Sequence, residues 1–347
     1  MSLELNTKQY LENLLNSQNI YDYSPKEVKQ IKAAPLDYIV NKLTRKKFRR
    51  RKLVDKTREE ITKKIQISID ENKPIHFVIP FGGYKHFWNH SYPEPDWAEV
   101  FNMVYITEFV LPVLGVHKPG VIVEYVSEDL MMARMDNFPQ EDLNKYSIAF
   151  KKLIEKYNKH TPDNLEFKFF RVGDKCDVGG IISQVEKLLP ERRAEFEKLS
   201  NEEKDKELHR SKRSFLWDGE QDFTGLSQKE KDEKIIESRL IELAYYDTEE
   251  KPEFLGEYLW EDNHICLLSS FGTTHDNDDF EDLTIGSAHG SIVDFWVGRG
   301  ILVQQDDKIF PKIVSKTQYE NMKEKLIPVD TDGLINMQNY EKIEVLK

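Results

Sequence analysis

The segment from Pro74 to Gly120 constrains the fold more than any other part of the chain. It begins with the β-branched and aromatic run IHFVIP, continues into FGGYK, and later enters the apolar stretch PDWAEVFNMVYITEFVLPVL. This order predicts a buried strand, a glycine loop and a long apolar helix. In open α/β sheets, ligands bind at the carboxyl ends of the strands, where loops and helix N-termini offer free N–H groups. We therefore expect a small-molecule site between Gly82 and Glu99.

Composition narrows the class of protein. The 347 residues carry a net charge of −12 and are 39% hydrophobic, which is typical of a globular chain with a hydrated acidic surface. That balance argues against nucleic acid as a general partner. The opening MSLELNTKQYLENLL has no apolar signal region, and no run of about 18 apolar residues occurs, so we expect a cytoplasmic protein that does not bind membranes. Cys176 and Cys266 are too few for a disulfide framework.

Strands and helices alternate along the middle of the chain. After the first helix come the strand VIVEYV, a helix from about Gln140 to Asn158, and the strand LEFKFFRV. Such β-α-β-α-β alternation predicts a Rossmann-like α/β fold with a mainly parallel sheet. We predict one elaborated domain that comprises a helical N-terminal region (1–72), a βαβαβ core (73–175), a helical insertion (176–250) and a β-rich C-terminal part (251–347). The C-terminal runs HICLLSSFG, SIVDFWVGRGILVQ and KIFPKIVS could extend the sheet with antiparallel strands.

A basic run lies in the N-terminal region, where nine Lys or Arg residues fall between Lys42 and Lys56. Such a run is compatible with nucleic-acid binding or nuclear localisation. It is equally compatible with a solvated helix face balanced by Glu59 and Glu60. A third interpretation is that one or two of the arginines reach a substrate phosphate.

The glycine loop offers a plausible ligand cradle. Gly82 and Gly83 would let the backbone approach a ligand closely, and Lys85 is a point charge suited to phosphate or carboxylate. Tyr84 and His86 are unusual in a plain turn. The spacings of the Walker A loop and of GxGxxG are both missing, and an ordinary turn remains an alternative. We expect Lys85 to be an exposed loop residue with little effect on stability.

Polar residues at two further positions are candidates for the same crevice. Asp96 and Glu99 lie three residues apart at the start of the apolar helix, where they could act as acid and base or simply cap the helix. Arg171 and Lys175 follow the third predicted strand, so they could face the same crevice as Lys85.

The loop FGTTHDNDDFEDLTIGSAHGS gathers carboxylates and imidazoles near the C-terminal part. A hard metal ion is one interpretation of the run Asp276 to Asp282. A hydrated loop between strands is the alternative that we adopt, so we expect neither a metal nor a cofactor. His289 is better placed for chemistry than its neighbours, because it sits among small residues at the start of a predicted strand.

The order of features around the glycine loop resembles the isonitrile (isocyanide) synthases of the pyoverdine and dityrosine biosynthesis group. The similarity covers about 60 residues, mainly 75–130, and rests on Pro80, Phe81, Lys85, Pro95, Asp96, Glu99, Pro119 and Gly120. After the second strand the family usually shows Ser-Asp-Gly, where this chain has Ser127, Glu128 and Asp129.

The resemblance implies a metal-free Rossmann-like enzyme that condenses the amine of an aromatic amino acid with the carbonyl of ribulose 5-phosphate. We therefore predict that the substrates are an amino acid and a sugar phosphate; the oligomeric state stays open. The residues predicted as catalytic are Lys85, Asp96 and His289, and those predicted to bind substrate are Gly82, Gly83, Tyr84, His86, Glu99, Arg171 and Lys175. The alternatives are a metal-dependent nucleotide-sugar transferase and a non-catalytic binding protein on a related fold.

Overall fold

The architecture is known from a computed structural model. It describes residues 2–16, 21–49, 53–83, 85, 94–127, 129, 139–174, 177–218, 225–249, 263–268, 283–284, 295–306 and 308–347.

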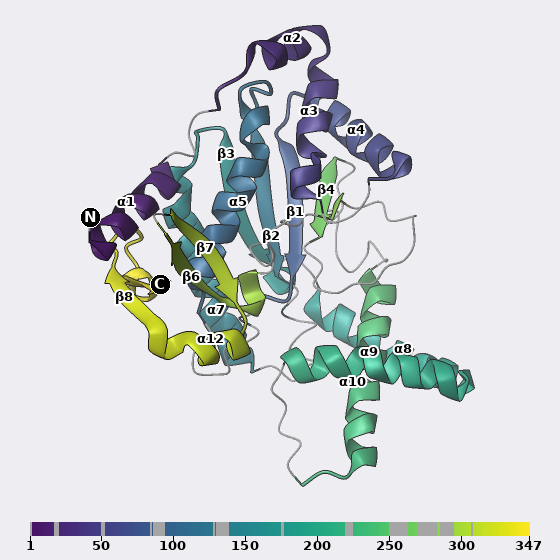
Figure 1. The fold of residues 1–347 in the computed structure, drawn as a ribbon. Helices are drawn as coiled ribbons and strands as arrows, with labels where there is room; N and C mark the ends of the chain where they lie inside the picture. Colours follow the sequence, from purple (N-terminus) through teal and green to yellow (C-terminus); the bar gives the residue numbers. More distant parts are fainter. Residues whose placement is uncertain are drawn as a thin grey trace.

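A five-stranded parallel sheet forms the centre of the molecule (Figure 1). Its strand order is β3-β2-β1-β4-β5, and all the described pairings are parallel. The strands are β1 (Ile75–Phe81), β2 (Val121–Ser127), β3 (Leu165–Arg171), β4 (His264–Leu268) and β5 (Leu283–Thr284). The predicted Rossmann-like α/β fold is confirmed.

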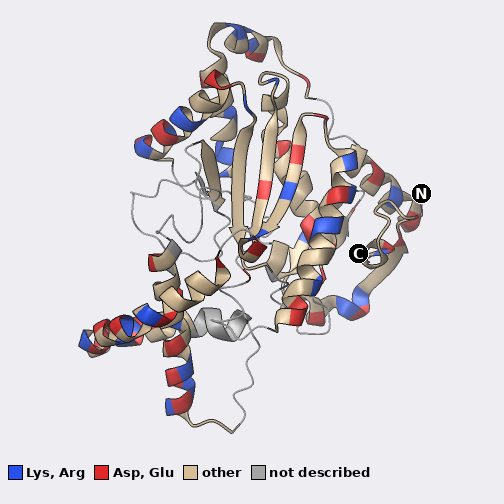
Figure 2. Ribbon diagram, turned by 180° about the vertical axis from the view of Figure 1, so that it is seen from behind, with Lys and Arg blue, Asp and Glu red and all other residues tan. Residues whose placement is uncertain are grey.

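The helices α5 (Trp97–Leu114) and α7 (Gln140–Tyr157) cover one face of this sheet, and α8 (Val178–Lys198) and α10 (Gln228–Glu249) pack against the other face near the carboxyl ends of the strands. Phe77 and Phe81 point toward α5 and α7, with ring centroids 5.7 Å from Phe109 and 5.8 Å from Phe150. Val78 alternates to the other face, where it packs with residues of α8 and α10. The α9 helix (Asn201–Asp218) lies between these two in sequence, and the described parts of all three helices carry charges of both signs (Figure 2).

The strand order creates a topological switch point between β1 and β4. The chain moves outward from β1 through β2 to β3, and after the three helices it returns to the other side of β1. Loops leaving the carboxyl ends of two such strands diverge and open a crevice, which is where open α/β sheets bind their ligands. The glycine loop after β1 lies at this position.

The α5 helix is the apolar centre of the fold. By length and composition it could cross a membrane, but 89% of its residues are buried inside the protein. Pro112 lies within this helix and cannot donate a hydrogen bond to the carbonyl of Glu108, four residues earlier. Arg45 compensates, since its Nη2 atom donates to the carbonyls of Glu108 (3.3 Å) and Phe109 (3.0 Å).

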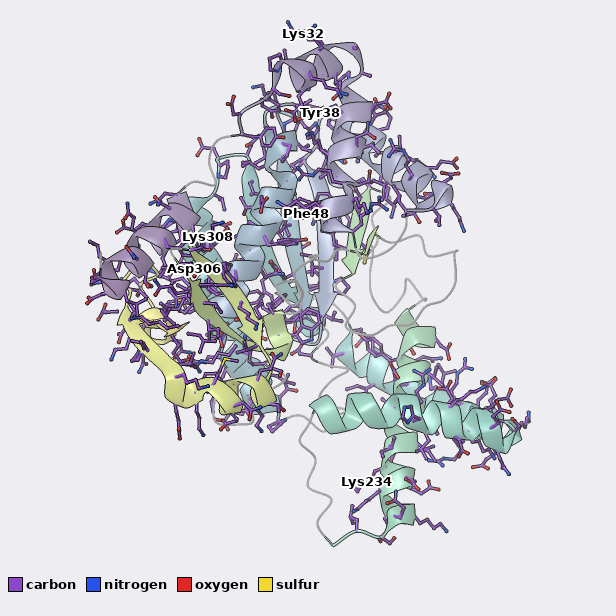
Figure 3. The ribbon with its side chains drawn as sticks, viewed as in Figure 1. Lys32, Tyr38, Phe48, Lys234, Asp306 and Lys308 are labelled. Carbon is purple, nitrogen blue, oxygen red and sulfur yellow. The ribbon has the colours of Figure 1, made fainter. Side chains whose placement is uncertain are left out.

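The N-terminal region is helical, as predicted. Pro25 and Pro35 occupy the first positions of α2 (Pro25–Ala33) and α3 (Pro35–Leu43), where a missing N–H group costs nothing. The other elements are α1 (Leu3–Asn16), η2 (Lys46–Phe48) and α4 (Asp55–Asp70). Phe48 anchors this layer on α5 (Figure 3), because its buried ring packs 5.0 Å from that of Tyr105.

A second, four-stranded sheet occupies the C-terminal part. Its order is β7-β6-β9-β8, formed by β6 (Arg299–Gln305), β7 (Lys308–Val314), β8 (Leu326–Asp330) and β9 (Lys342–Leu346). Short helical segments accompany it: η6 (Phe295–Val297), α12 (Lys316–Met322), η7 (Lys323–Lys325) and η8 (Gln338–Tyr340). Asp306, in the β6–β7 turn labelled in Figure 3, has a left-handed φ of 56°.

This second sheet corrects the expectation that antiparallel C-terminal strands extend the first one. β4 does join the central sheet, but it pairs parallel to β1. β6 and β7 pair antiparallel to each other and belong to the separate sheet. The physical reason is a close contact at Gly300, where an added Cβ would lie 2.3 Å from the backbone nitrogen of Ala98. β6 therefore lies directly against the start of α5.

The helical insertion consists of α8, α9 and α10, and residues 214–218 still belong to α9. The connector η3 (Asn158–His160) and the turn η4 (Val172–Asp174) flank β3 and complete the described elements.

Candidate functional site

Lys85 lies just beyond the carboxyl end of β1, and its side chain is fully buried. Its Nζ atom donates to both carboxylate oxygens of Glu99 (2.7 and 2.8 Å) and to the carbonyl of Phe295 (3.0 Å), and it lies 3.4 Å from Asp96 Oδ1. The side chains of Lys85 and Glu99 both have no exposed surface. The expectation of an exposed loop lysine is therefore wrong. A charge this deep needs a partner, and Glu99 provides one.

Glu99 and Asp96 are held by the start of α5. Asp96 is the N-cap, and its side chain accepts a hydrogen bond from Ala98 N (2.7 Å), while Glu99 accepts one from Asp96 N (2.8 Å). This reciprocal capping box satisfies two N–H groups that the helix leaves unpaired. Asp96 Oδ1 also accepts from Gly300 N (3.1 Å), which ties β6 to the same point. Asp96 and Glu99 therefore cap α5, which was one of the two predicted interpretations. The same arrangement is compatible with a role as acid and base.

Burial raises the pKa of the Glu99 carboxyl to about 7, because the loss of water outweighs the stabilisation of the carboxylate by Lys85. Tyr146 on α7 adds a further contact, since its hydroxyl donates to Glu99 Oε1 at 3.1 Å. Burial, with the negative charge of Glu99 next, raises the pKa of Tyr146 well above its ordinary value. The phenol thus stays a donor at neutral pH. A carboxyl that titrates near neutrality can accept or release a proton under physiological conditions.

A second polar cluster lies at the same edge, at the ends of β2 and β3. Arg171 pairs with Asp129 through Nε at 2.7 Å and through Nη2. The strand register places Arg171 beside Ser127, and Ser127 beside Phe81 at the end of β1. Gly83 completes the cluster: its φ is 76°, and an added Cβ would lie 1.8 Å from Ser127 Oγ. Only glycine fits this position without rearrangement.

The predicted site residues are therefore distributed as follows. Gly82, Gly83, Lys85 and the α5 acids gather at the carboxyl edge of the sheet, and Arg171 lies at the same edge through its pairing with Asp129. The remaining predicted residues lie outside the described residues: Tyr84, His86, Lys175, His289 and the acidic run Asp276 to Asp282. Within the described part of the chain, no group of three or more His, Cys, Asp or Glu side chains could hold a metal ion.

The basic run is partly accounted for by internal contacts. Lys42 pairs with Glu27 at 2.5 Å, Arg45 caps the carbonyls of α5, and Lys47 pairs with Glu108. The balancing acids for these cations are thus Glu27 and Glu108. Other members of the run, at positions 50–52, lie outside the described residues.

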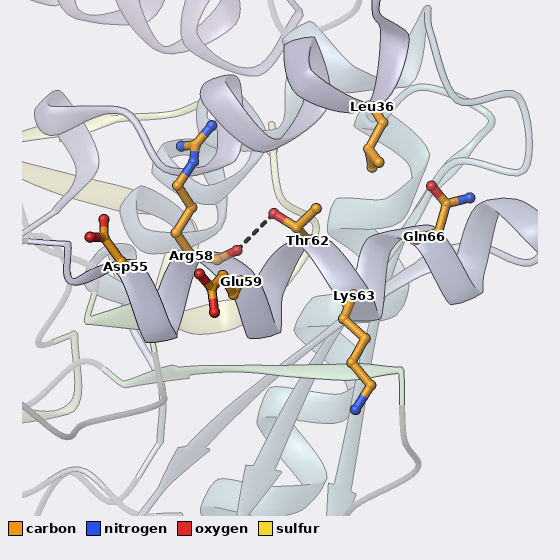
Figure 4. A pocket seen from close by; sticks show the side chains of 7 residues that line it. All are labelled: Leu36, Asp55, Arg58, Glu59, Thr62, Lys63 and Gln66. Atoms are coloured by element: carbon orange, nitrogen blue, oxygen red, sulfur yellow. Dashed lines mark hydrogen bonds between the residues drawn. The ribbon is translucent and has the colours of Figure 1, made fainter.

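A groove of about 570 Å³ lies elsewhere, along α4 and beside Leu36 of α3 (Figure 4). Acidic and basic side chains alternate along it, and Arg58 is engaged with Asn41 at 2.7 Å. It is remote from the carboxyl ends of the strands, because α4 leads into the amino end of β1. We therefore place the candidate site at the switch point.

Three contributors to the site were not predicted from the sequence. Tyr146 falls on the apolar face of α7 with Leu143 and Phe150, so its spacing predicts a core residue and nothing indicates its contact with Glu99. The Phe295 carbonyl is a backbone group 210 residues from Lys85, and no pattern identifies it. Asp129 was noted only as a departure from Ser-Asp-Gly, although a carboxylate just after a strand is a usable signal.

Comparisons with protein-family models and with curated protein sequences gave no match. Among solved structures, the PvcA (PA2254) protein from Pseudomonas aeruginosa is similar, with a TM-score of 0.59 and 17% sequence identity, over 90% of this chain and 100% of that chain. A tryptophanyl-tRNA synthetase homolog from Entamoeba histolytica gives a TM-score of 0.27 at 10% identity, over 74% of this chain and 54% of that chain, and supports no argument. The likeness to PvcA shows a shared α/β fold along nearly the whole chain.

Proposed function

We propose that the protein is an isonitrile-synthase-like enzyme that acts on an aromatic amino acid and a ketose phosphate such as ribulose 5-phosphate. The single observation that carries the proposal is the buried pair of Lys85 and Glu99, directly after the glycine loop at the switch point of the sheet. A buried ion pair is an expensive way to stabilise a fold, because the desolvation of two charges offsets most of their attraction. Its position at the ligand-binding edge favours a role in chemistry.

The first chemical step of such a reaction is imine formation. The amino nitrogen attacks the carbonyl carbon of the ketose, a carbon–nitrogen bond forms, and the carbonyl oxygen takes up protons and leaves as water. This step needs a group that both releases and accepts protons near neutral pH. Glu99 has that property because its pKa is raised to about 7.

In this proposal Lys85 stabilises negative charge. Its ammonium, held by Glu99 and by the Phe295 carbonyl, is a preorganised positive charge at the carboxyl edge. Such a charge stabilises an oxyanion that develops on the attacked carbonyl without reorganising during the reaction. Asp96 fixes the position of β6 relative to the start of α5, because its Oδ1 atom accepts hydrogen bonds from both Ala98 N and Gly300 N.

Two further observations support this proposal. The sequence resemblance to isonitrile synthases rests on Lys85, Asp96 and Glu99 among other residues, and these three meet in space. The fold likeness to PvcA extends over the whole of that structure.

The test is product formation. The purified protein is incubated with tyrosine, tryptophan or phenylalanine and with ribulose 5-phosphate, and products are followed by liquid chromatography and mass spectrometry. We expect a product that retains the amino-acid skeleton and carries an isonitrile in place of the amine. Ribose 5-phosphate, an aldose isomer, controls for non-enzymatic glycation. Absence of any such product with all three amino acids would contradict the proposal.

A matched pair of variants ties the activity to the site. Lys85→Met removes the charge of the buried lysine, whereas Lys168→Met removes that of a lysine on β3 that is 40% exposed and pairs with Glu166. We expect loss of product with the first variant and retention with the second. Equal activity of both would exclude Lys85 from the reaction.

A further inference from the structure

The polar cluster of Ser127, Asp129 and Arg171 contains two buried atoms with unused hydrogen-bonding capacity. Ser127 is completely buried and Asp129 is 2% exposed. Among the described residues, neither Ser127 Oγ nor Asp129 Oδ1 has a hydrogen-bond partner. Burial raises the pKa of the Asp129 carboxyl, and Arg171 and the neighbouring Ser127 hydroxyl both oppose that rise. The hydroxyl therefore lies beside the carboxylate, although the distance and angles between the two side chains fall outside ordinary hydrogen-bonding geometry. Buried polar atoms are nearly always paired, so two such atoms side by side require an explanation.

The other carboxylate oxygen of Asp129 is already engaged. Arg171 binds Oδ2 through Nε and Nη2, which fixes the carboxylate plane and balances its charge. Oδ1 is left as an acceptor beside the Ser127 hydroxyl, which can donate or accept. The cluster thus presents two adjacent oxygen atoms with no net charge.

These properties select among ligands. A free ammonium ion would find little net attraction, because the Asp129 charge is balanced by Arg171. An anion would be repelled by Oδ1. A neutral group with two adjacent O–H donors fits, because one hydroxyl can donate to Oδ1 while the other exchanges a hydrogen bond with Ser127.

We propose that Ser127 and Asp129 bind vicinal hydroxyl groups of a polyhydroxylated substrate, with Arg171 as the residue that positions Asp129. The inference rests on the proposed function in so far as it takes the carboxyl edge of the sheet as the substrate site, and it assigns the sugar part of the ketose phosphate to the ends of β2 and β3. Gly83 lies in close contact with Ser127, so the glycine loop that follows β1 covers one side of this cluster.

Ser127→Ala provides the sharpest test, because a structural and a ligand-binding role predict different results. If the hydroxyl has no partner without ligand, its removal leaves stability unchanged or raises it. The same substitution should weaken ligand binding. We expect an unchanged or higher midpoint of thermal unfolding together with an affinity for ribulose 5-phosphate that is lower by about tenfold.

Binding is measured by isothermal titration calorimetry with ribulose 5-phosphate and, as the probe that lacks hydroxyl groups on carbon, with inorganic phosphate. Wild-type protein should prefer the sugar phosphate, and both Ser127→Ala and Asp129→Asn should lose most of that preference. Ser147→Ala is the matched control, since Ser147 is also a buried serine without a hydrogen-bond partner among the described residues but lies on α7. It should bind like wild type.

The outcomes separate this inference from the proposed reaction. If Ser127→Ala binds ribulose 5-phosphate as tightly as wild type, or if wild type shows no preference over inorganic phosphate, the inference is overturned even where product forms. If the preference is present and is lost in Ser127→Ala while no amino acid yields product, the hydroxyl site stands and the proposed reaction fails. Should Asp129→Asn fail to fold because Arg171 loses its partner, Ser127→Ala alone decides.

Discussion

Lys85 Nζ lies 2.7 and 2.8 Å from the two carboxylate oxygens of Glu99, and neither side chain is exposed to solvent. Glu99 also closes the capping box of α5 by accepting a hydrogen bond from Asp96 N. The Glu99 carboxylate therefore both binds the loop lysine and caps the start of α5. This coupling makes the stability of the fold and the electrostatics of the candidate site interdependent.

The first prediction concerns the stability of the pair. Lys85→Met leaves Glu99 as an uncompensated buried acid, so we expect a loss of roughly 3 kcal/mol in the free energy of unfolding above neutral pH. The double variant Lys85→Met, Glu99→Gln removes both charges and should be more stable than Lys85→Met alone. Urea denaturation of the two variants provides the measurement. Equal stability of the single and double variants would show that the two charges are not coupled.

The second prediction is a dependence of stability on pH. The pKa of Glu99 is raised from 4.5 to about 7, so the folded state binds a proton more tightly than the unfolded state. The associated stability is complete below about pH 4.5, declines between the two values, and is lost above about pH 7, roughly 3 kcal/mol in total. Glu99→Gln, which can still cap the helix, should flatten this decline. Denaturation across this pH range checks the expectation, and parallel curves for the two proteins would refute it.

The third prediction concerns Gly83. Ala at this position would meet Ser127 Oγ at 1.8 Å and would also carry a φ of 76°. Gly225 has a similar φ of 81°, but no atom of the described residues lies within 4 Å of an added Cβ there. Gly225→Ala should therefore lose only the backbone preference of about 1 kcal/mol, and Gly83→Ala considerably more. Thermal unfolding of the two variants compares them directly. A smaller loss for Gly83→Ala would mean that the loop is not packed against β2.

The fourth prediction is that activity survives exhaustive chelation. The physical basis is that carboxylates such as Asp276, Asp278, Asp279 and Asp282 repel one another and relax when hydrated, whereas a metal site needs them converged on a supporting shell. Turnover is measured before and after treatment with a chelator. Activity that disappears and returns with Mg²⁺ or Mn²⁺ would favour a metal-dependent nucleotide-sugar transferase.

The first three strands of the central sheet were predictable because the hydrophobic pattern of each strand agrees with the turn-forming residues that flank it. The run IHFVIP is framed by Pro74 and the glycine pair, and the structure has β1 at Ile75–Phe81. Asp96 and Glu99 were identified as capping candidates for a similar reason, since the capping box is a short-range motif. These features depend on neighbours within a few residues.

The rest depends on contacts between distant residues. Lys85 stands in a polar loop sequence, and its burial arises from Glu99 and from a carbonyl 210 residues away. The strands β8 (LIPVD) and β9 (KIEVL) are only five residues long, and β8 contains a proline that cannot donate a backbone hydrogen bond, so their pairing into a second sheet carried no clear signal. The contact of Gly300 with α5, which keeps β6 out of the central sheet, likewise has no signal in the sequence.

The most direct test of the central claim follows the carbon that the amino nitrogen attacks. Ribulose 5-phosphate labelled with ¹³C at its carbonyl carbon is incubated with the wild-type protein and the accepted aromatic amino acid, and the product is examined by ¹³C NMR. The account predicts that the isonitrile carbon carries the label and that Lys85→Met forms no labelled product. An isonitrile without label, or undiminished labelled product from Lys85→Met, would contradict it.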